Sequence, residues 1–217
     1  MQKGLTELVF ILDKSGSMSG LEADTIGGFN ARLGKQQAEA GECRITTVLF
    51  DNTYTLLHDR IDIRAVSAIT DREYQVGGTT ALLDAMGRTI QKIASVQKHT
   101  AEGYRAEKVM FVIITDGEEN ASRAYSIDMI KTLIERQKTK HGWEFIFLGA
   151  NIDAVETAGQ FGIAPNRAVD YLADSEGIGL NFHALNQTVR AFRETGAVAQ
   201  APLEAIREDA RRRGKRK

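Results

Sequence analysis

Short runs of apolar residues alternate along the chain with longer segments in which apolar residues recur every three or four positions. The runs predict β-strands and the spaced segments predict amphipathic helices, and this alternation is typical of a parallel α/β sheet. Three runs are apolar at every position, which predicts strands that are covered on both faces. These runs are Leu8–Leu12, Val109–Ile114 and Phe145–Leu148.

Three more segments complete the predicted sheet. Ile45–Phe50 is interrupted by threonines and Tyr54–Ile63 alternates loosely, so we expect an outer strand and an antiparallel edge strand joined by the turn at Asp51-Asn52. A short last strand is expected at Ala168–Leu172. Because right-handed crossovers link parallel strands, we predict a three-layer, doubly wound, Rossmann-like sheet that is mostly parallel, with helices on both faces.

Helical spacing of apolar residues marks five segments between and after these strands. Their apolar positions are Leu21, Ile26, Phe29 and Leu33; Leu82, Met86, Ile90 and Ile93; Ile127, Ile130 and Ile134; the segment Ala154–Phe161; and Ile178, Phe182, Leu185, Val189 and Phe192. The 217 residues are enough for one domain, which we place at residues 1–196. Residues 197–217 are expected to be a basic tail, in part helical or disordered.

The formal charge of −1 conceals an asymmetry, because seven basic and two acidic residues lie between Arg207 and Lys217. The rest of the chain is therefore acidic, and we expect no nucleic-acid binding apart from contacts by the tail. Cys43 is the one cysteine, which excludes an internal disulfide and indicates a reducing compartment. No apolar run approaches the length of a membrane span and no leader is visible, so we expect a cytoplasmic protein without membrane contact.

Polar residues follow the buried strands, where ligands bind in open α/β sheets. The segment Asp13-Lys14-Ser15-Gly16-Ser17 follows the first strand, Thr115-Asp116-Gly117-Glu118-Glu119-Asn120 follows a central one, and Gly77-Gly78-Thr79-Thr80 precedes a helix. Each segment alone suits a turn or a helix cap. Together they predict two carboxylates and several hydroxyls at one place, a set of oxygen ligands that suits Mg²⁺ better than Ca²⁺.

These three segments, in this order, resemble the von Willebrand factor type A domain family and its metal-ion-dependent adhesion site, over about residues 5 to 195. The resemblance implies a metal held by Asp13, Ser15, Ser17, Asp116 and a threonine. The segment Thr80-Ala81-Leu82-Leu83-Asp84-Ala85 is similar to the pattern of bacterial members and favours Thr80 over Thr79. Mg²⁺ is the expected ion, with Mn²⁺ or Ca²⁺ as substitutes.

The same resemblance implies a binding module without enzymatic activity. A protein partner would supply a glutamate or aspartate to the open coordination position of the metal. Bacterial intracellular relatives suggest an ATP-driven remodelling assembly as the setting. The partner's identity, the pathway and the oligomeric state do not follow from the residues.

The main alternative is a phosphotransferase of the haloacid dehalogenase type with Asp13 as the nucleophile, because Asp13–Ser17 also resembles the phosphorylation motif of ion pumps. Such an enzyme needs an activating lysine, and Lys108 should lie at the opposite edge of the sheet. A serine hydrolase built on Ser19 is disfavoured, since that residue lies too far beyond its strand. The preferred interpretation, a binding module, therefore assigns no catalytic residues.

Two smaller interpretations complete the prediction. Glu118, Glu119 and Asn120 flank the expected metal, and we interpret them as solvated loop residues rather than as determinants of partner choice. Asn151 and Asp153 lie between a strand and a helix, where helix capping is the more common role.

Overall fold

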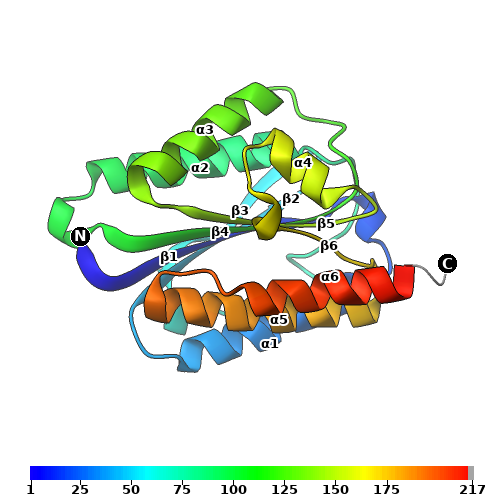
Figure 1. Cartoon of the computed structure of the whole chain (residues 1–217), viewed down its shortest axis with the longest axis horizontal. Coiled ribbons are helices and arrows are strands. Elements are labelled where there is room, and N and C mark those ends of the chain that lie inside the picture. Colours follow the sequence, from blue (N-terminus) through cyan, green and yellow to red (C-terminus); the bar gives the residue numbers. More distant parts are fainter. Residues whose placement is uncertain (215–217) are drawn as a thin grey trace.

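Six strands form one sheet in the order β3-β2-β1-β4-β5-β6 in the computed structural model, which describes residues 1–214 (Figure 1). The strands are β1 (Gln2–Asp13), β2 (Cys43–Phe50), β3 (Tyr54–Asp62), β4 (Ala106–Asp116), β5 (Glu144–Ala150) and β6 (Ala168–Asp170). Strand β3 pairs antiparallel with β2 at one edge, and the other pairs are parallel. The predicted sheet with its antiparallel edge strand is confirmed.

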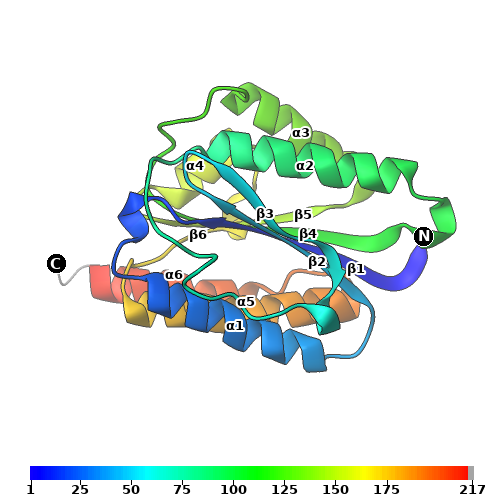
Figure 2. The ribbon, with the colours of Figure 1, turned by 180° about the vertical axis from the view of Figure 1, so that it is seen from behind.

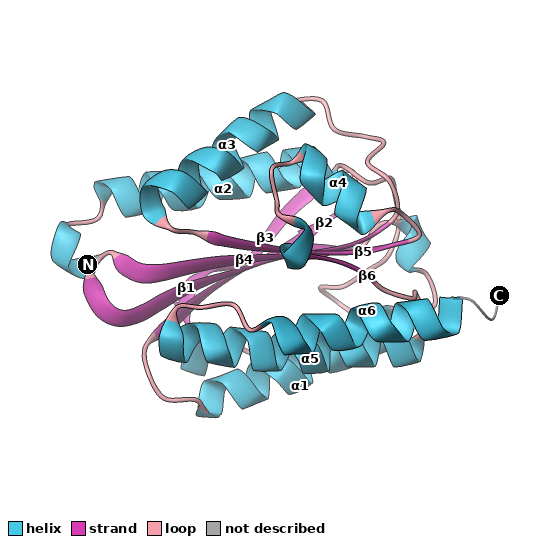
Figure 3. Cartoon of the chain, viewed as in Figure 1, coloured by secondary structure: helices cyan, strands magenta, loops and turns pink. Residues whose placement is uncertain are grey.

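Helices cover both faces of this sheet, α2, α3 and α4 on one side and α1, α5 and α6 on the other (Figures 2 and 3). The helices are α1 (Glu22–Ala38), α2 (Leu82–His99), α3 (Ile127–His141), α4 (Ala154–Gln160), α5 (Ser175–Thr195) and α6 (Gln200–Gly214). The three-layer arrangement of the prediction is therefore confirmed. In residues 1–214, none of the helices combines the length and apolar character needed to cross a membrane.

Alternate side chains of the central strands fill two hydrophobic cores. On β1, Phe10 belongs to the core beneath α1 and α5, whereas Val9 and Ile11 belong to the core beneath α2. All three side chains are fully buried. This explains why the central strands are apolar at every position, since each face of the sheet is covered by helices.

Several element boundaries differ from the prediction. Strand β1 begins at Gln2, well before the apolar run, because its polar start pairs with β4. Strand β6 ends at Asp170, whose carboxylate accepts a hydrogen bond from the Ala154 backbone at the start of α4 (2.7 Å). Ile127 lies in the first turn of α3 and is 41% exposed, so it does not join the buried stripe of that helix.

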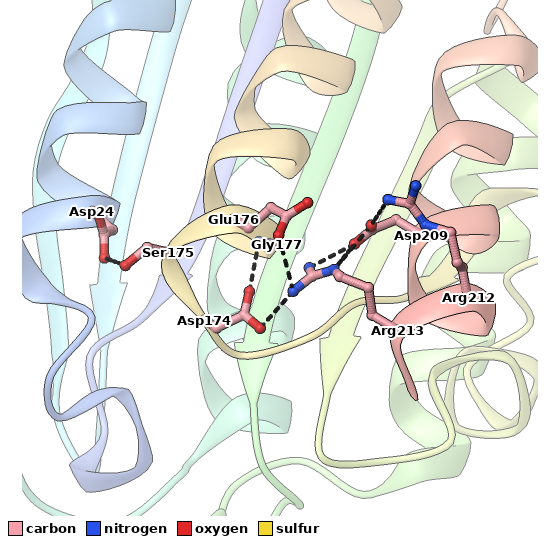
Figure 4. Close-up of polar contacts among 8 residues, drawn as sticks. All are labelled: Asp24, Asp174, Ser175, Glu176, Gly177, Asp209, Arg212 and Arg213. Atoms are coloured by element: carbon pink, nitrogen blue, oxygen red, sulfur yellow. Dashed lines mark hydrogen bonds and ion pairs between the residues drawn. The ribbon is translucent and has the colours of Figure 1, made fainter. Parts of the chain in front are cut away.

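Helix α6 packs against α5 and β6 and buries Leu203 and Ile206. Its arginines pair with nearby carboxylates, and Arg213 contacts Asp174, Glu176 and Asp209 (Figure 4). Most of the segment expected to be a basic tail, as far as residue 214, is thus a helix that packs against the domain through its apolar face. The end of the expected tail, 215–217, lies outside the described residues, and the domain boundary at 196 stays a prediction.

Candidate metal centre

The two predicted aspartates lie at the ends of neighbouring strands. Asp13 ends β1 and Asp116 ends β4, and the parallel pairing of these strands extends to Leu12 and Ile114. Each aspartate is 1% exposed. The parallel register therefore brings together two buried carboxylates that are 103 positions apart in the sequence.

The Asp13 carboxylate is fixed by three hydrogen bonds. One oxygen accepts from the Ser15 backbone N–H (2.7 Å). The other accepts from the Thr115 hydroxyl (2.8 Å) and from the Asp116 backbone N–H (3.2 Å). The Tyr74 hydroxyl also donates to the Asp13 backbone carbonyl. These contacts hold the carboxylate in one orientation and tie the loop after β1 to the end of β4.

Both predicted serines lie in the same place. The Ser15 and Ser17 hydroxyl oxygens are 3.1 Å apart, and Ser17 also donates to the backbone carbonyl of Asp116. Ser15 is buried, whereas Ser17 is exposed. The residues Asp13, Ser15 and Ser17 stand at every second position, and their oxygen-bearing side chains lie together near the end of β4.

The glycine-rich loop contacts the loop after β1 through its backbone. Gly16 donates to the carbonyl of Gly78 (3.1 Å), and Gly77 donates to the carbonyl of Lys14 (2.9 Å). Gly78 has a φ of +71°, and a Cβ there would lie 2.1 Å from the Asn52 side-chain oxygen. Only glycine combines that backbone conformation with such a close approach.

Of the two candidate threonines, Thr80 is 4% exposed and Thr79 is exposed. The backbone N–H of Thr80 donates to the Asn120 side chain (2.9 Å), and its carbonyl accepts from the Asn120 N–H (3.1 Å). The loop after β4 therefore holds Thr80 in place, and each of the three predicted loops is hydrogen-bonded to the other two.

Glu118 and Asn120 are exposed, as the interpretation of this segment as solvated loop residues expects, whereas Glu119 is half-buried and both Glu119 and Asn120 make specific hydrogen bonds. The Glu119 carboxylate accepts hydrogen bonds from the backbone N–H of Leu83 (2.8 Å) and from Ser122, through both its N–H (2.6 Å) and its hydroxyl (2.7 Å). Both residues join the loop after β4 to the start of α2. A charged loop motif alone does not reveal the contact with α2, because the Leu83 N–H belongs to a segment distant in sequence.

Asn151 is a site residue that the sequence reasoning missed. It follows β5, adopts a φ of +56°, and donates from its side-chain amide to the Asp116 carboxylate. The helix cap that was expected here comes from Asp153, which accepts from the Glu156 N–H (2.7 Å). The sequence signal that could have identified Asn151 is its place directly after β5. This strand pairs with β4, so its end lies at the same edge of the sheet as Asp116.

Burial raises the pKa of both aspartates. For Asp13, desolvation outweighs the hydrogen bonds that favour the charged form. For Asp116, desolvation is again the largest cause, the Asn151 hydrogen bond opposes it, and the charge of Asp13 adds to the rise. Two carboxylates that repel each other in a buried place are a site that a cation would stabilise.

The remaining charged groups bear on what the site can bind. Lys14 forms an ion pair with Asp51 rather than with Asp13 or Asp116. In residues 1–214, no group of three or more His, Cys, Asp or Glu side chains is placed to hold a metal. The candidate set is instead two carboxylates with the serine and threonine hydroxyls, a composition that suits a hard cation such as Mg²⁺ or Mn²⁺.

The geometry does not favour the enzymatic alternatives. Lys108 lies near the start of β4, at the opposite end of the strand from Asp116, and donates to the Arg193 carbonyl. The four histidines lie on separate elements: His58 on β3, His99 on α2, His141 on α3 and His183 on α5. Neither an activating lysine nor a histidine base therefore accompanies the buried aspartates within the described chain.

Comparisons with solved structures agree with this fold. Similar structures include manganese-loaded TRAP protein of Plasmodium vivax (20% identity, TM-score 0.58, covering 82% of this chain and 72% of that one). The ArnB paralog VWA2 of Sulfolobus acidocaldarius (17%, TM-score 0.51) and the PilB minor pilin of Streptococcus sanguinis (13%, TM-score 0.59, D319A mutant) are also similar. At these identities the likeness shows the fold alone.

In the last two comparisons the matched region includes 88% of this chain. It includes 45% of the ArnB paralog and 63% of the pilin. A comparison with curated protein sequences finds no match. A sequence model of the von Willebrand factor type A domain matches residues 7–182, which is most of the chain and includes all three loops of the site. The chain therefore belongs to the von Willebrand factor type A domain family.

Proposed function

We propose that this protein is a non-enzymatic module that binds a protein partner through a divalent metal ion. Asp13, Ser15, Ser17, Thr80 and Asp116 would hold the ion, with Mg²⁺ as the expected metal and Mn²⁺ or Ca²⁺ as substitutes. The ion would supply an electrophilic centre to which a glutamate or aspartate of the partner can bind.

The observation that carries this proposal is the pairing of Asp13 and Asp116. Both carboxylates are buried, their pKa values are raised, and the nearest lysine in the loop, Lys14, is paired elsewhere. Two carboxylates balance a divalent cation and leave no excess negative charge to repel an acidic partner. The similar TRAP protein of Plasmodium vivax is manganese-loaded, which supports a divalent metal as the ligand here.

The chain's own residues would position the ligands before any metal binds. Ser15, Thr115 and the Asp116 backbone orient the Asp13 carboxylate, and Asn151 orients that of Asp116. Such outer hydrogen bonds preserve ligand geometry and tune metal affinity. The carboxylates therefore need little rearrangement on binding, which lowers the entropic cost of forming the site.

The setting of the module is part of the same proposal. The single, buried Cys43 is consistent with a reducing, cytoplasmic environment. Resemblance to bacterial members suggests an ATP-driven remodelling assembly as the partner. The pairing of Arg207, Arg211, Arg212 and Arg213 with carboxylates of this chain reduces the free positive charge available for nucleic acid.

A capture experiment tests the proposal. The immobilised protein is incubated with lysate in Mg²⁺ or in EDTA, and candidate partners are then repeated as purified proteins. We expect a partner retained in Mg²⁺, released by EDTA and lost in Asp13→Ala, but retained by Asp71→Ala, which removes the charge of an exposed aspartate.

Mutating acidic residues of the purified partner, one at a time, then identifies the carboxylate. Binding that is equal in Mg²⁺ and EDTA, or that survives Asp13→Ala, contradicts the metal-dependent mechanism. A phosphoenzyme formed on Asp13 would instead support the phosphotransferase alternative.

A further inference from the structure

A groove lies between the carboxyl-terminal halves of α2 and α3, two helices that run side by side on one face of the sheet (Figures 1 and 2). Its volume is about 830 Å³, which is in the range of ligand-binding sites. The groove lies at the start of β4, whereas Asp116 ends that strand. Because β4 spans 11 residues, the groove is roughly 30 Å from the metal centre.

The inner surface of this groove is largely apolar. Val109 of β4 and Trp143, which directly precedes β5, are buried side chains of its lining. Ala94 on α2 and Leu133 on α3 add half-buried apolar surface. Met1 also lines the groove and is 66% exposed. The groove can therefore take up an apolar side chain of a ligand.

Four basic side chains lie around this apolar surface. Lys98 comes from α2, Arg136 and Lys140 come from α3, and Arg105 directly precedes β4. The two lysines and Arg136 are exposed, and Arg105 is half-buried. None of the four forms an ion pair with a carboxylate within residues 1–214. Their charges are therefore available to a ligand, unlike those of the α6 arginines.

Arg105 is held in place by backbone carbonyls. Its guanidinium donates to the carbonyl of Thr100 (2.7 Å) and to that of Lys98 (3.2 Å), at the end of α2. These contacts orient the guanidinium but do not neutralise its charge. Because a guanidinium has five N–H donors, Arg105 can still donate to a carboxylate of a ligand.

Two glutamates of the lining oppose these cations in part. The Glu107 carboxylate accepts a hydrogen bond from the Gly4 backbone N–H (2.6 Å), so it is engaged with β1. Glu102 is the other acidic residue of the groove. The basic side chains thus outnumber the acidic ones, and the groove favours a negatively charged ligand.

The ends of the two helices explain only part of this positive charge. The carboxyl end of a helix attracts cations, which accounts for Lys98 and Lys140 in the last turns of α2 and α3. Arg136 precedes the last turn of α3, and Arg105 belongs to neither helix. These two arginines therefore indicate a binding role beyond helix stabilisation.

We propose that the groove between α2 and α3 binds an acidic segment of a protein partner. Carboxylates of the segment pair with the four basic side chains, and an apolar side chain packs against Trp143 and Leu133. A peptide segment suits the groove better than a nucleic acid, because apolar surface lies among the cations and the whole chain, with a net charge of −1, does not attract a long polyanion. This site requires no metal and is independent of the proposed metal centre.

Trp143 provides a direct measurement of binding. It is the single tryptophan of the chain and lines the groove, so its fluorescence and the NMR signal of its indole N–H report on this place. The probe is a short peptide with glutamates on both sides of a central leucine pair, titrated into the full chain in EDTA at about 50 mM salt. We expect a saturable change with a Kd below about 1 mM, weakened about fivefold or more at about 300 mM salt by screening of the charge pairs.

Variants of the protein and of the peptide separate the groove from general surface attraction. Arg136→Glu combined with Lys140→Glu should weaken binding by about tenfold or more. Lys131→Glu makes the same kind of charge reversal on α3 outside the groove, and should change the Kd by less than about twofold. All three side chains are exposed and form no ion pair within residues 1–214, so their replacement does not disturb the fold. A peptide with serines in place of the leucine pair should bind about threefold or more weakly.

The proposal is overturned if the acidic peptide produces no saturable change at Trp143 up to about 1 mM. Unchanged affinity in the double variant, or equal binding of a peptide in which lysines replace the glutamates, would overturn it as well. Equal binding of the serine peptide would contradict the part given to the apolar surface. A single-stranded DNA oligonucleotide that displaces the peptide and binds more tightly would identify a nucleic-acid-binding face instead.

Discussion

Replacing Asp13 and Asp116 by asparagine should affect the stability of the metal-free protein in different ways, although both changes remove one buried negative charge. The Asp13 carboxylate accepts from three donors through both of its oxygens, whereas Asp116 accepts from the side chain of Asn151 through one. An asparagine at position 13 therefore turns an NH₂ group toward at least one buried donor. At position 116 the amide oxygen can still face Asn151.

The size of the difference follows from these contacts. A buried donor left without an acceptor costs about 1–3 kcal/mol, and relief of the buried charge offsets part of this cost at position 13. At position 116 the raised pKa means that folding disfavours the ionised form, so removing the charge stabilises the fold or leaves it unchanged. We expect Asp116→Asn to be at least as stable as the wild type, and Asp13→Asn to lie about 1–3 kcal/mol below Asp116→Asn.

Urea denaturation at neutral pH in EDTA measures this difference, with Asp71→Asn as an exposed control that should change stability by less than about 0.5 kcal/mol. Adding Mg²⁺ at about 100 times its Kd should then stabilise the wild type by about 2.7 kcal/mol and neither site variant. If Asp116→Asn proves the less stable of the two, or if both variants respond to Mg²⁺ as the wild type does, the assignment of the site is wrong.

Three further outcomes are expected elsewhere in the molecule. Asn151→Gly keeps the left-handed backbone but removes the amide that orients Asp116, so calorimetry should show metal affinity reduced by about 10-fold or more, and unchanged affinity would contradict that role. Leu203→Ala should destabilise the protein by about 2–5 kcal/mol in denaturant titrations, because this α6 side chain is fully buried; a change below about 0.5 kcal/mol would mean that α6 does not dock. Burial lowers the pKa of His58 below its ordinary 6.5, so the unfolded chain binds the proton more readily and stability falls as the pH drops through this range. His58→Gln should flatten the stability curve between about pH 7 and 5, and an unchanged slope would exclude His58 as its source.

The sequence predicted the alternation of strands and helices along the chain. The three wholly apolar runs became β1, β4 and β5, since strands covered on both faces need apolar residues at every position. The same topology explains why Asp13 and Asp116 could be paired in advance, because parallel strands end at a common edge. Their role as metal ligands stays a prediction.

Other features depend on contacts that no local pattern encodes. In the sequence, Asn151 stands between a strand and a helix, as a helix cap would. Only the pairing of β5 with β4 brings its side chain to Asp116. The basic residues after position 196 suggested a tail that is in part helical or disordered, whereas the burial of Leu203 and Ile206 determines where α6 lies. Likewise, only the packing of α1 against β1 reveals that the buried Arg32 Nε and Nη1 atoms have no hydrogen-bond acceptor within residues 1–214.

Anomalous diffraction from crystals soaked in Mn²⁺ is the most direct test of the metal centre. We predict one strong peak among the side-chain oxygens of Asp13, Ser15, Ser17, Thr80 and Asp116, and no peak at this position in crystals of Asp13→Ala. A peak at another position, or none at Mn²⁺ concentrations that other proteins of this family would bind, would contradict the assignment of these residues as metal ligands.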